Sequence, residues 1–118
     1  MHKLAQLDQR YVWHPFTQMR DWAKREPIVL VSGKGAELED ANGKRYLDGN
    51  ASIWTNLHGH NHPKLNRAIE RQLTKVAHTS SLGLANEPAS LLAEKLVKAA
   101  GRPLRKVFYS DDGSTALE

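Results

Sequence analysis

Apolar residues alternate with polar ones in the first half of the chain and repeat at helical spacing in the second half. The β-branched run 28–31, the alternating segment 36–40 and the segment 45–48 predict three strands. Asn42-Gly43 separates the second strand from the third and favours a type I′ turn, because both residue types tolerate positive φ. The pattern therefore predicts a small antiparallel β-meander.

Two helices are expected after the meander. The first begins at Pro63, because proline suits the first helical position, and its apolar face repeats at helical spacing. That face consists of Leu65, Ile69, Leu73 and Val76. The second helix begins at Pro88 and ends at Gly101. Residues 1–27 are expected to be irregular, since Pro15 and Pro27 discourage long helices.

A strand, a turn and the start of a helix are predicted for the last part of the chain. The strand covers 105–109, and Thr115 and Glu118 have the spacing of a capping box with Thr115 as the N-cap. Gly113 and Ser114 precede them, where free N–H groups and the helix dipole can hold an anion such as phosphate. From these residues alone, an ordinary capped helix start is the favoured interpretation.

The order of these elements predicts an α/β fold, since the final strand, turn and helix start resemble the opening of an α/β domain. A capping box announces a helix, and the body of that helix does not follow Glu118. We therefore expect the chain to be the front part of a longer protein.

Composition narrows the possible functions. The 118 residues carry a net charge of +4, but the 17 basic residues are scattered among 13 acidic ones, so nucleic-acid binding is not expected. Cysteine is absent, which excludes disulfides and cysteine metal sites. No apolar stretch reaches the ~20 residues that a membrane span needs. A cytoplasmic protein without membrane or nucleic-acid partners is the expectation.

Two loop segments contain candidate chemistry. The segment 58–62 holds three histidines at alternate positions, which suits zinc, but Gly59 and Pro63 interrupt an extended strand and no carboxylate lies nearby in sequence. Loop packing is therefore favoured over a metal site. Trp54 lies in the loop after the meander, where a substrate wall and core packing are equally good interpretations.

An aromatic and polar cluster covers Trp13–Met19. Its favoured interpretation is a segment that attaches the N-terminus to a core or to a partner subunit. This interpretation is stronger than a catalytic role for His14.

Together, four stretches resemble the N-terminal region of the class III pyridoxal-phosphate aminotransferases, in particular those of biotin synthesis. These stretches are Trp13–Met19, Asp48–Gly49 with Ser52–Trp54, Leu57–Pro63 and Phe108–Ser114. The resemblance implies the N-terminal portion of a fold-type I transferase. Residues 1–85 would be an N-terminal segment with the meander and first helix, part of the small domain. Residues 86–118 would begin the large domain, which binds pyridoxal phosphate.

The resemblance also implies a reaction and its site. A homodimer would transfer an amino group from a small-molecule donor to the ketone of 8-amino-7-oxononanoate, giving 7,8-diaminononanoate. Gly113 and Ser114 would hold the cofactor phosphate, Ile53 and Trp54 would lie in the substrate wall, and Phe16 would lie near the substrate. The best-known members carry two aromatic residues in place of Ile53-Trp54 and a tyrosine in place of Phe16. S-adenosylmethionine and lysine both remain possible donors.

No catalytic residue is assigned within the chain. Members of the family need a Schiff-base lysine, which the resemblance places downstream of Glu118, so residues 1–118 alone are expected to be inactive. Two alternatives remain. One is another class III ω-amino transaminase with a different amine substrate, and the other is a small basic binding module without catalysis.

Overall fold

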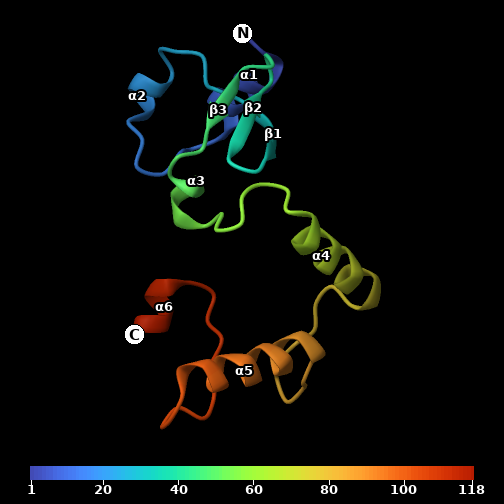
Figure 1. The fold of residues 1–118 in the computed structure, drawn as a ribbon. Helices are drawn as coiled ribbons and strands as arrows, with labels where there is room; N and C mark the ends of the chain where they lie inside the picture. The colour runs from blue at the N-terminus through green and yellow to red at the C-terminus, as the bar shows by residue number, and fades with distance from the viewer. The chain divides into compact units, whose positions relative to one another are not determined.

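The computed structural model describes residues 1–118, which form two units, Met1–Gln72 and Leu73–Glu118 (Figure 1). The first unit begins with two helices and a three-stranded sheet, and the second is helical. The elements, in chain order, are α1 (Lys3–Tyr11), α2 (Met19–Trp22), β1 (Leu30–Lys34), β2 (Glu37–Asp40), β3 (Arg45–Leu47), α3 (Ala51–Trp54), α4 (Pro63–Lys75), α5 (Glu87–Ala100) and α6 (Gly113–Leu117). Helix α4 begins in the first unit and ends in the second.

The three strands form the predicted antiparallel meander, in the order β1-β2-β3. Leu38 of β2 lies opposite Gly33 of β1 and Tyr46 of β3. The ladder between β1 and β2 is irregular between Leu30 and Ser32. β1 begins at Leu30, two residues later than the apolar run that predicted it.

The turn between β2 and β3 is not the predicted type I′ turn. Gly43 has a φ of 81°, whereas Asn42 is not among the residues with positive φ. The backbone N–H of Asp40 donates to the carbonyl of Lys44 at 2.9 Å, which closes a three-residue loop of the kind that ends in a left-handed glycine. Asp40 stabilises this turn, because its Oδ1 accepts the N–H groups of Asn42 and Lys44 at 2.9 and 3.0 Å.

The N-terminal region contains helix α1, where irregular structure was expected. His2 caps this helix, since its Nδ1 accepts the Leu4 N–H at 3.2 Å. Ala5 of α1 is fully buried, and Pro27 is a second buried apolar residue of this unit. The prediction was wrong because prolines lie only beyond the helix, at positions 15 and 27, and neither interrupts α1.

The second unit confirms the helix predicted after residue 86. The Asn86 side chain accepts the Ala89 N–H at 3.0 Å at the start of α5, and Gly101, with a φ of 75°, ends it. The strand predicted over 105–109 is absent. Tyr109 instead donates its hydroxyl hydrogen to the Ala89 carbonyl at 2.6 Å, which attaches the segment to α5. An extended segment becomes a strand only when a neighbour pairs with it.

The domain boundary expected between residues 85 and 86 stays a prediction. None of the helices is both long and apolar enough to cross a membrane.

Candidate functional site

The loop after β3 contains a left-handed turn, α3, in which four successive residues have positive φ. The φ angles of Ala51, Ser52, Ile53 and Trp54 are 51°, 49°, 61° and 66°. The Trp54 N–H donates to the Asn50 carbonyl at 2.8 Å, which closes the turn. A left-handed helical conformation costs about 1–2 kcal/mol per residue for residues with a Cβ. Strain of this kind persists only where the surroundings enforce it, and it is concentrated at functional sites.

The carboxylate of Asp48 holds this turn in place. Its Oδ1 accepts the Ser52 backbone N–H at 2.9 Å, and its Oδ2 accepts the Ser52 hydroxyl at 2.8 Å. The same Oδ2 lies 2.7 Å from Nε2 of His60. These bonds, that from the Ser52 backbone N–H foremost, hold the pKa of Asp48 below its usual value. Asp48 is therefore an ionised anchor.

His60 is fixed in turn on its other ring nitrogen. Nδ2 of Asn56 lies 3.2 Å from Nδ1 of His60, and because an amide nitrogen can only donate, Nδ1 is the acceptor. Nε2 then carries the hydrogen that faces Asp48. The side chains of Asp48 and His60 are 5% and 16% exposed, so the pair is screened from solvent.

The backbone of the meander binds the segment that contains His60. The backbones of Gly35 and His60 exchange two hydrogen bonds, of 3.0 and 2.7 Å. A Cβ on Gly59 would lie 2.7 Å from the Gly35 oxygen, and a Cβ on Gly33 would lie 3.0 Å from Cβ and Cγ of His60. Only glycine permits this approach, so the sheet and the histidine loop form one packed body.

The predicted substrate residues project outward from the first unit. Ile53 and Trp54 are 67% and 88% exposed, and Phe16 is fully exposed with a φ of 49°. Ile53 and Trp54 are consecutive residues of the left-handed turn, and no ring contact joins Phe16 to Trp54. All three thus stand on left-handed backbone, in a position to contact another molecule or chain.

The sequence analysis missed the polar residues that support these loops. Asp48 and His60 are twelve residues apart, and the prediction that loop packing is favoured over a metal site in 58–62 rested in part on the absence of a carboxylate close by in sequence. In the structure a carboxylate does orient one of these rings, since Oδ2 of Asp48 lies 2.7 Å from Nε2 of His60. His58 and His62 are in ring contact with each other, with centroids 5.7 Å apart.

The turn before α6 differs from the prediction in its cap. Asp112, not Thr115, is the N-cap, and its Oδ1 accepts the Thr115 N–H at 2.7 Å. This bond is the main reason why the pKa of Asp112 lies below its usual value. The prediction was wrong by three residues because aspartate and threonine both cap helices well, and Asp112 comes first.

The residues of this turn fit a phosphate group. Around a Cβ built on Gly113 no atom lies within 4 Å, so the space beside the turn is open. The N–H of Gly113 and the hydroxyl of Ser114 make no hydrogen bond within the chain and are available as donors. The ionised Asp112 next to them opposes a second anion, so the phosphate would depend on these donors and on further groups.

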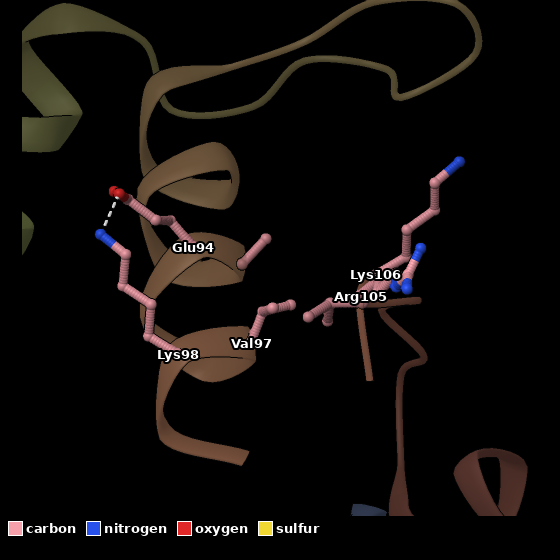
Figure 2. A pocket seen from close by; sticks show the side chains of 7 residues that line it. Glu94, Val97, Lys98, Arg105 and Lys106 are labelled. Atoms are coloured by element: carbon pink, nitrogen blue, oxygen red, sulfur yellow. Dashed lines mark hydrogen bonds and ion pairs between the residues drawn. The ribbon is translucent and has the colours of Figure 1, made fainter. Parts of the chain in front are cut away.

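An apolar groove lies elsewhere in the second unit, between α5 and the segment 105–107 (Figure 2). Its volume is about 410 Å³. Val97 points toward the segment, while Glu94 and Lys98 turn away and pair with each other at 2.5 Å (Figure 2). None of the predicted site residues lines this groove.

Comparisons with known proteins identify the family. The model of the aminotransferase class-III family matches residues 19–118. Among curated relatives, adenosylmethionine-8-amino-7-oxononanoate aminotransferase of Staphylococcus aureus is 53% identical over 98% of this chain and 26% of its own length. The enzyme of the same name from Geobacter sulfurreducens is 50% identical over 98% of this chain and 25% of its own length. The chain thus spans about a quarter of the length of these relatives.

Solved structures agree with the sequence comparison. The adenosylmethionine-8-amino-7-oxononanoate aminotransferase of Methanocaldococcus jannaschii matches with a TM-score of 0.92 and 42% identity, over 96% of this chain and 26% of that one. The ω-transaminase of Pseudomonas jessenii, solved in complex with PMP, matches with a TM-score of 0.90 and 30% identity, over 98% of this chain and 26% of that one. The fold is therefore that of the N-terminal portion of a transaminase, and the chain belongs to the class III aminotransferase family.

Proposed function

We propose that residues 1–118 form the N-terminal part of an aminotransferase that acts in biotin biosynthesis. The enzyme would transfer an amino group to the ketone of 8-amino-7-oxononanoate and release 7,8-diaminononanoate. The observation that carries this proposal is the 53% identity, over nearly the whole chain, with an enzyme named for that substrate. The ω-transaminase of P. jessenii shares the fold at only 30% identity, so a different amine substrate is the less favoured alternative.

Ile53, Trp54 and Phe16 are proposed to contact the substrate. Their exposure and left-handed backbone support this role, because a packing residue needs neither. A variant of the P. jessenii enzyme in which one tryptophan is replaced by glycine was engineered for the synthesis of bulky amines. The replacement of a tryptophan in a variant made for bulky amines supports a wall function for Trp54.

Gly113 and Ser114 are proposed to bind the phosphate of pyridoxal phosphate. Support comes from the open space beside Gly113 and from the donors of both residues. When bound, the cofactor supplies an electron sink for amino transfer. This segment contributes only the anchor for its phosphate, and no catalytic residue is proposed within residues 1–118.

The donor, assembly and location of the enzyme are further parts of the proposal. S-adenosylmethionine is the proposed amino donor, since the relatives that share about half of the residues are named for adenosylmethionine. Lysine is the competing donor, because Phe16 lacks a hydroxyl group. We propose a cytoplasmic homodimer, as the family resemblance implies.

A segment exchange tests the proposal directly. Residues 1–118 replace the aligned segment of the S. aureus enzyme, and this chimera is assayed for diaminononanoate with pyridoxal phosphate, the keto acid and S-adenosylmethionine. A second chimera receives the aligned segment of the P. jessenii ω-transaminase, and residues 1–118 alone serve as a control expected to be inactive. We expect activity only in the first chimera. A folded, cofactor-loaded first chimera without activity would contradict the proposal.

A further inference from the structure

We propose that Asp48 and His60 are positioning residues, which lock the left-handed turn at 51–54 and so fix the direction of Trp54 toward the substrate. This inference rests on the proposed function, because it takes Trp54 to be part of the substrate wall. Neither residue is proposed to touch the substrate. Both act through the backbone of the turn.

The turn needs an external restraint because its sequence does not favour it. Ala51, Ser52, Ile53 and Trp54 all carry a Cβ, and Ile53 is β-branched, the class for which positive φ is least favourable. A chain of these residues would leave this conformation if the backbone were free. The Asp48 carboxylate supplies this restraint, because it accepts both the backbone N–H and the hydroxyl of Ser52, at 2.9 and 2.8 Å.

His60 makes this restraint rigid. It donates to Asp48 across 2.7 Å and is fixed by Asn56 on its other nitrogen and by the backbone of Gly35. The backbone of Gly35 therefore fixes His60, the imidazole of His60 orients the Asp48 carboxylate, and this carboxylate binds Ser52 in the turn. The step between His60 and Asp48 is largely screened from solvent, whereas Ser52 and Gly35 are exposed at the two ends of the path.

The arrangement of these groups excludes a nucleophilic role for Ser52. In a catalytic triad the serine hydroxyl donates to the histidine, which in turn donates to the aspartate. Here the Ser52 hydroxyl and the His60 ring both face the same oxygen of Asp48. The imidazole of His60 is therefore not placed to accept the hydroxyl proton as in a triad, and the cluster serves to hold the backbone.

Four variants in the chimera test this role. Asp48→Asn removes the charge that the turn depends on, and His60→Leu removes the donor, while His60→Gln keeps an N–H group that can reach Asp48. Gly33→Ala leaves the cluster chemically intact but places a Cβ 3.0 Å from Cβ and Cγ of His60, which displaces the ring. His58→Gln is the matched control, since His58 is an exposed histidine of the same loop.

Two measurements separate positioning from general stability. Backbone chemical shifts of residues 51–54 report the sign of φ and do not depend on activity. The KM for the keto acid and kcat are determined on cofactor-saturated protein, each variant being made with Trp54 and with Trp54→Ala. A misdirected wall should raise KM between about tenfold and a hundredfold while cofactor binding is unchanged.

We expect Asp48→Asn, His60→Leu and Gly33→Ala to lose the positive φ values and to raise KM. His60→Gln should keep the positive φ values and a KM close to that of the unchanged chimera. The increase in KM should disappear in the Trp54→Ala background, because the pair acts through that side chain. Positive φ values retained in Asp48→Asn and His60→Leu would overturn the inference. An increase in KM that is equally large in the Trp54→Ala background would also overturn it. An inactive wild-type chimera would contradict the proposed function alone, and the φ values would still decide whether the pair holds the turn.

Discussion

Nε2 of His14 lies 2.9 Å from Oδ2 of Asp8, and the same oxygen accepts the indole N–H of Trp22 at 3.2 Å. The rings of His14 and Trp22 are in contact, with centroids 4.6 Å apart. One carboxylate of α1 thus attaches both α2 and the loop that carries Phe16. The segment Trp13–Met19 was expected to attach the N-terminus to a core or a partner, and the structure shows it bound to its own first helix.

Asp8→Asn should therefore loosen the N-terminal helices. The asparagine keeps the shape of the side chain but loses its charge, and a hydrogen bond to a charged group contributes about 1.5–3 kcal/mol. Because Asp8 and His14 are about a quarter exposed, we expect a loss of about 1–2 kcal/mol in the free energy of unfolding. Urea unfolding of the chimera, followed by tryptophan fluorescence, measures this loss.

The matched control is Asp21→Asn in the neighbouring helix α2, which removes an exposed ion pair between Asp21 and Lys24. It should cost less than about 0.5 kcal/mol, since exposed pairs contribute little. Equal effects of the two variants would show that the Asp8 carboxylate is not a special attachment point.

A second prediction concerns the turn at Gly113 and Ser114. Ser114→Ala removes one hydroxyl donor and should weaken cofactor binding by about 1–2 kcal/mol, because the backbone donors remain. Gly113→Val should weaken binding more, since the side chain enters the space proposed for the phosphate. Titration of pyridoxal phosphate into the chimera measures both.

The structure makes the Gly113 variant informative. Gly113 does not have a positive φ, and a Cβ there meets no atom within 4 Å, so the substitution should leave folding of this segment unchanged. Any loss of affinity then reports the approaching phosphate. If both variants bind the cofactor as the parent does, the turn is only a helix cap.

A third prediction concerns pH, through Asp40 and Tyr46 of the meander. The Tyr46 hydroxyl donates to Oδ2 of Asp40 at 2.8 Å. This bond is the main cause that lowers the pKa of Asp40 below 3.8 and raises the pKa of Tyr46 above 10.0. Asp40 therefore contributes stability above pH 3.8, which is lost as the pH falls through its folded-state pKa. Tyr46 contributes below pH 10.0, and its contribution is lost as the pH rises through its folded-state pKa.

The meander should accordingly be most stable on a plateau between these two limits. In Tyr46→Phe the pKa of Asp40 should rise, because the largest cause that lowers it is removed while burial still raises it, and the N–H groups of Asn42 and Lys44 still donate to the carboxylate. A titration of the Asp40 carboxyl carbon by NMR measures this change. An identical pKa in the variant would show that the phenol does not govern Asp40.

The local elements could be predicted from the sequence because their signals are local. Proline and apolar spacing located α4 and α5, and alternation located the meander. The strand expected over 105–109 was wrong because strand pairing depends on a neighbour that the segment itself does not encode. The turn after Asp40 was wrong because the Asp40 side chain, rather than the Asn-Gly pair, determines the hydrogen bonds of the loop.

Some residues of the candidate site could be predicted from the sequence, and others could not. Exposed residues such as Trp54 could be proposed from a resemblance, and their contacts with substrate stay a prediction. The Asp48–His60 pair could not be predicted, because two residues twelve positions apart meet only after the sheet and its loop have packed. Four successive left-handed residues without glycine also have no sequence signal, since the hydrogen bonds of Asp48 enforce them against local preference.

The last prediction separates the roles of Trp54 and Phe16. In the chimera, Trp54→Ala should leave a folded, cofactor-loaded enzyme, because the side chain is 88% exposed and its loss leaves no cavity within this unit. The KM for the keto acid should rise at least about tenfold, since the loss of a large apolar contact exceeds the 1.4 kcal/mol that a factor of ten represents.

Phe16→Tyr should change the choice of donor rather than the keto-acid step. Phe16 is fully exposed on left-handed backbone, so a hydroxyl at its tip can be added without a clash inside this unit. If that hydroxyl helps to seat the donor, the ratio of S-adenosylmethionine to lysine turnover should shift toward S-adenosylmethionine, with KM for the keto acid unchanged. Half-reaction rates of each variant with each donor and with the keto acid measure both effects. Unfolding of Trp54→Ala, together with unchanged donor rates in Phe16→Tyr, would identify both aromatic residues as packing groups for the rest of the enzyme.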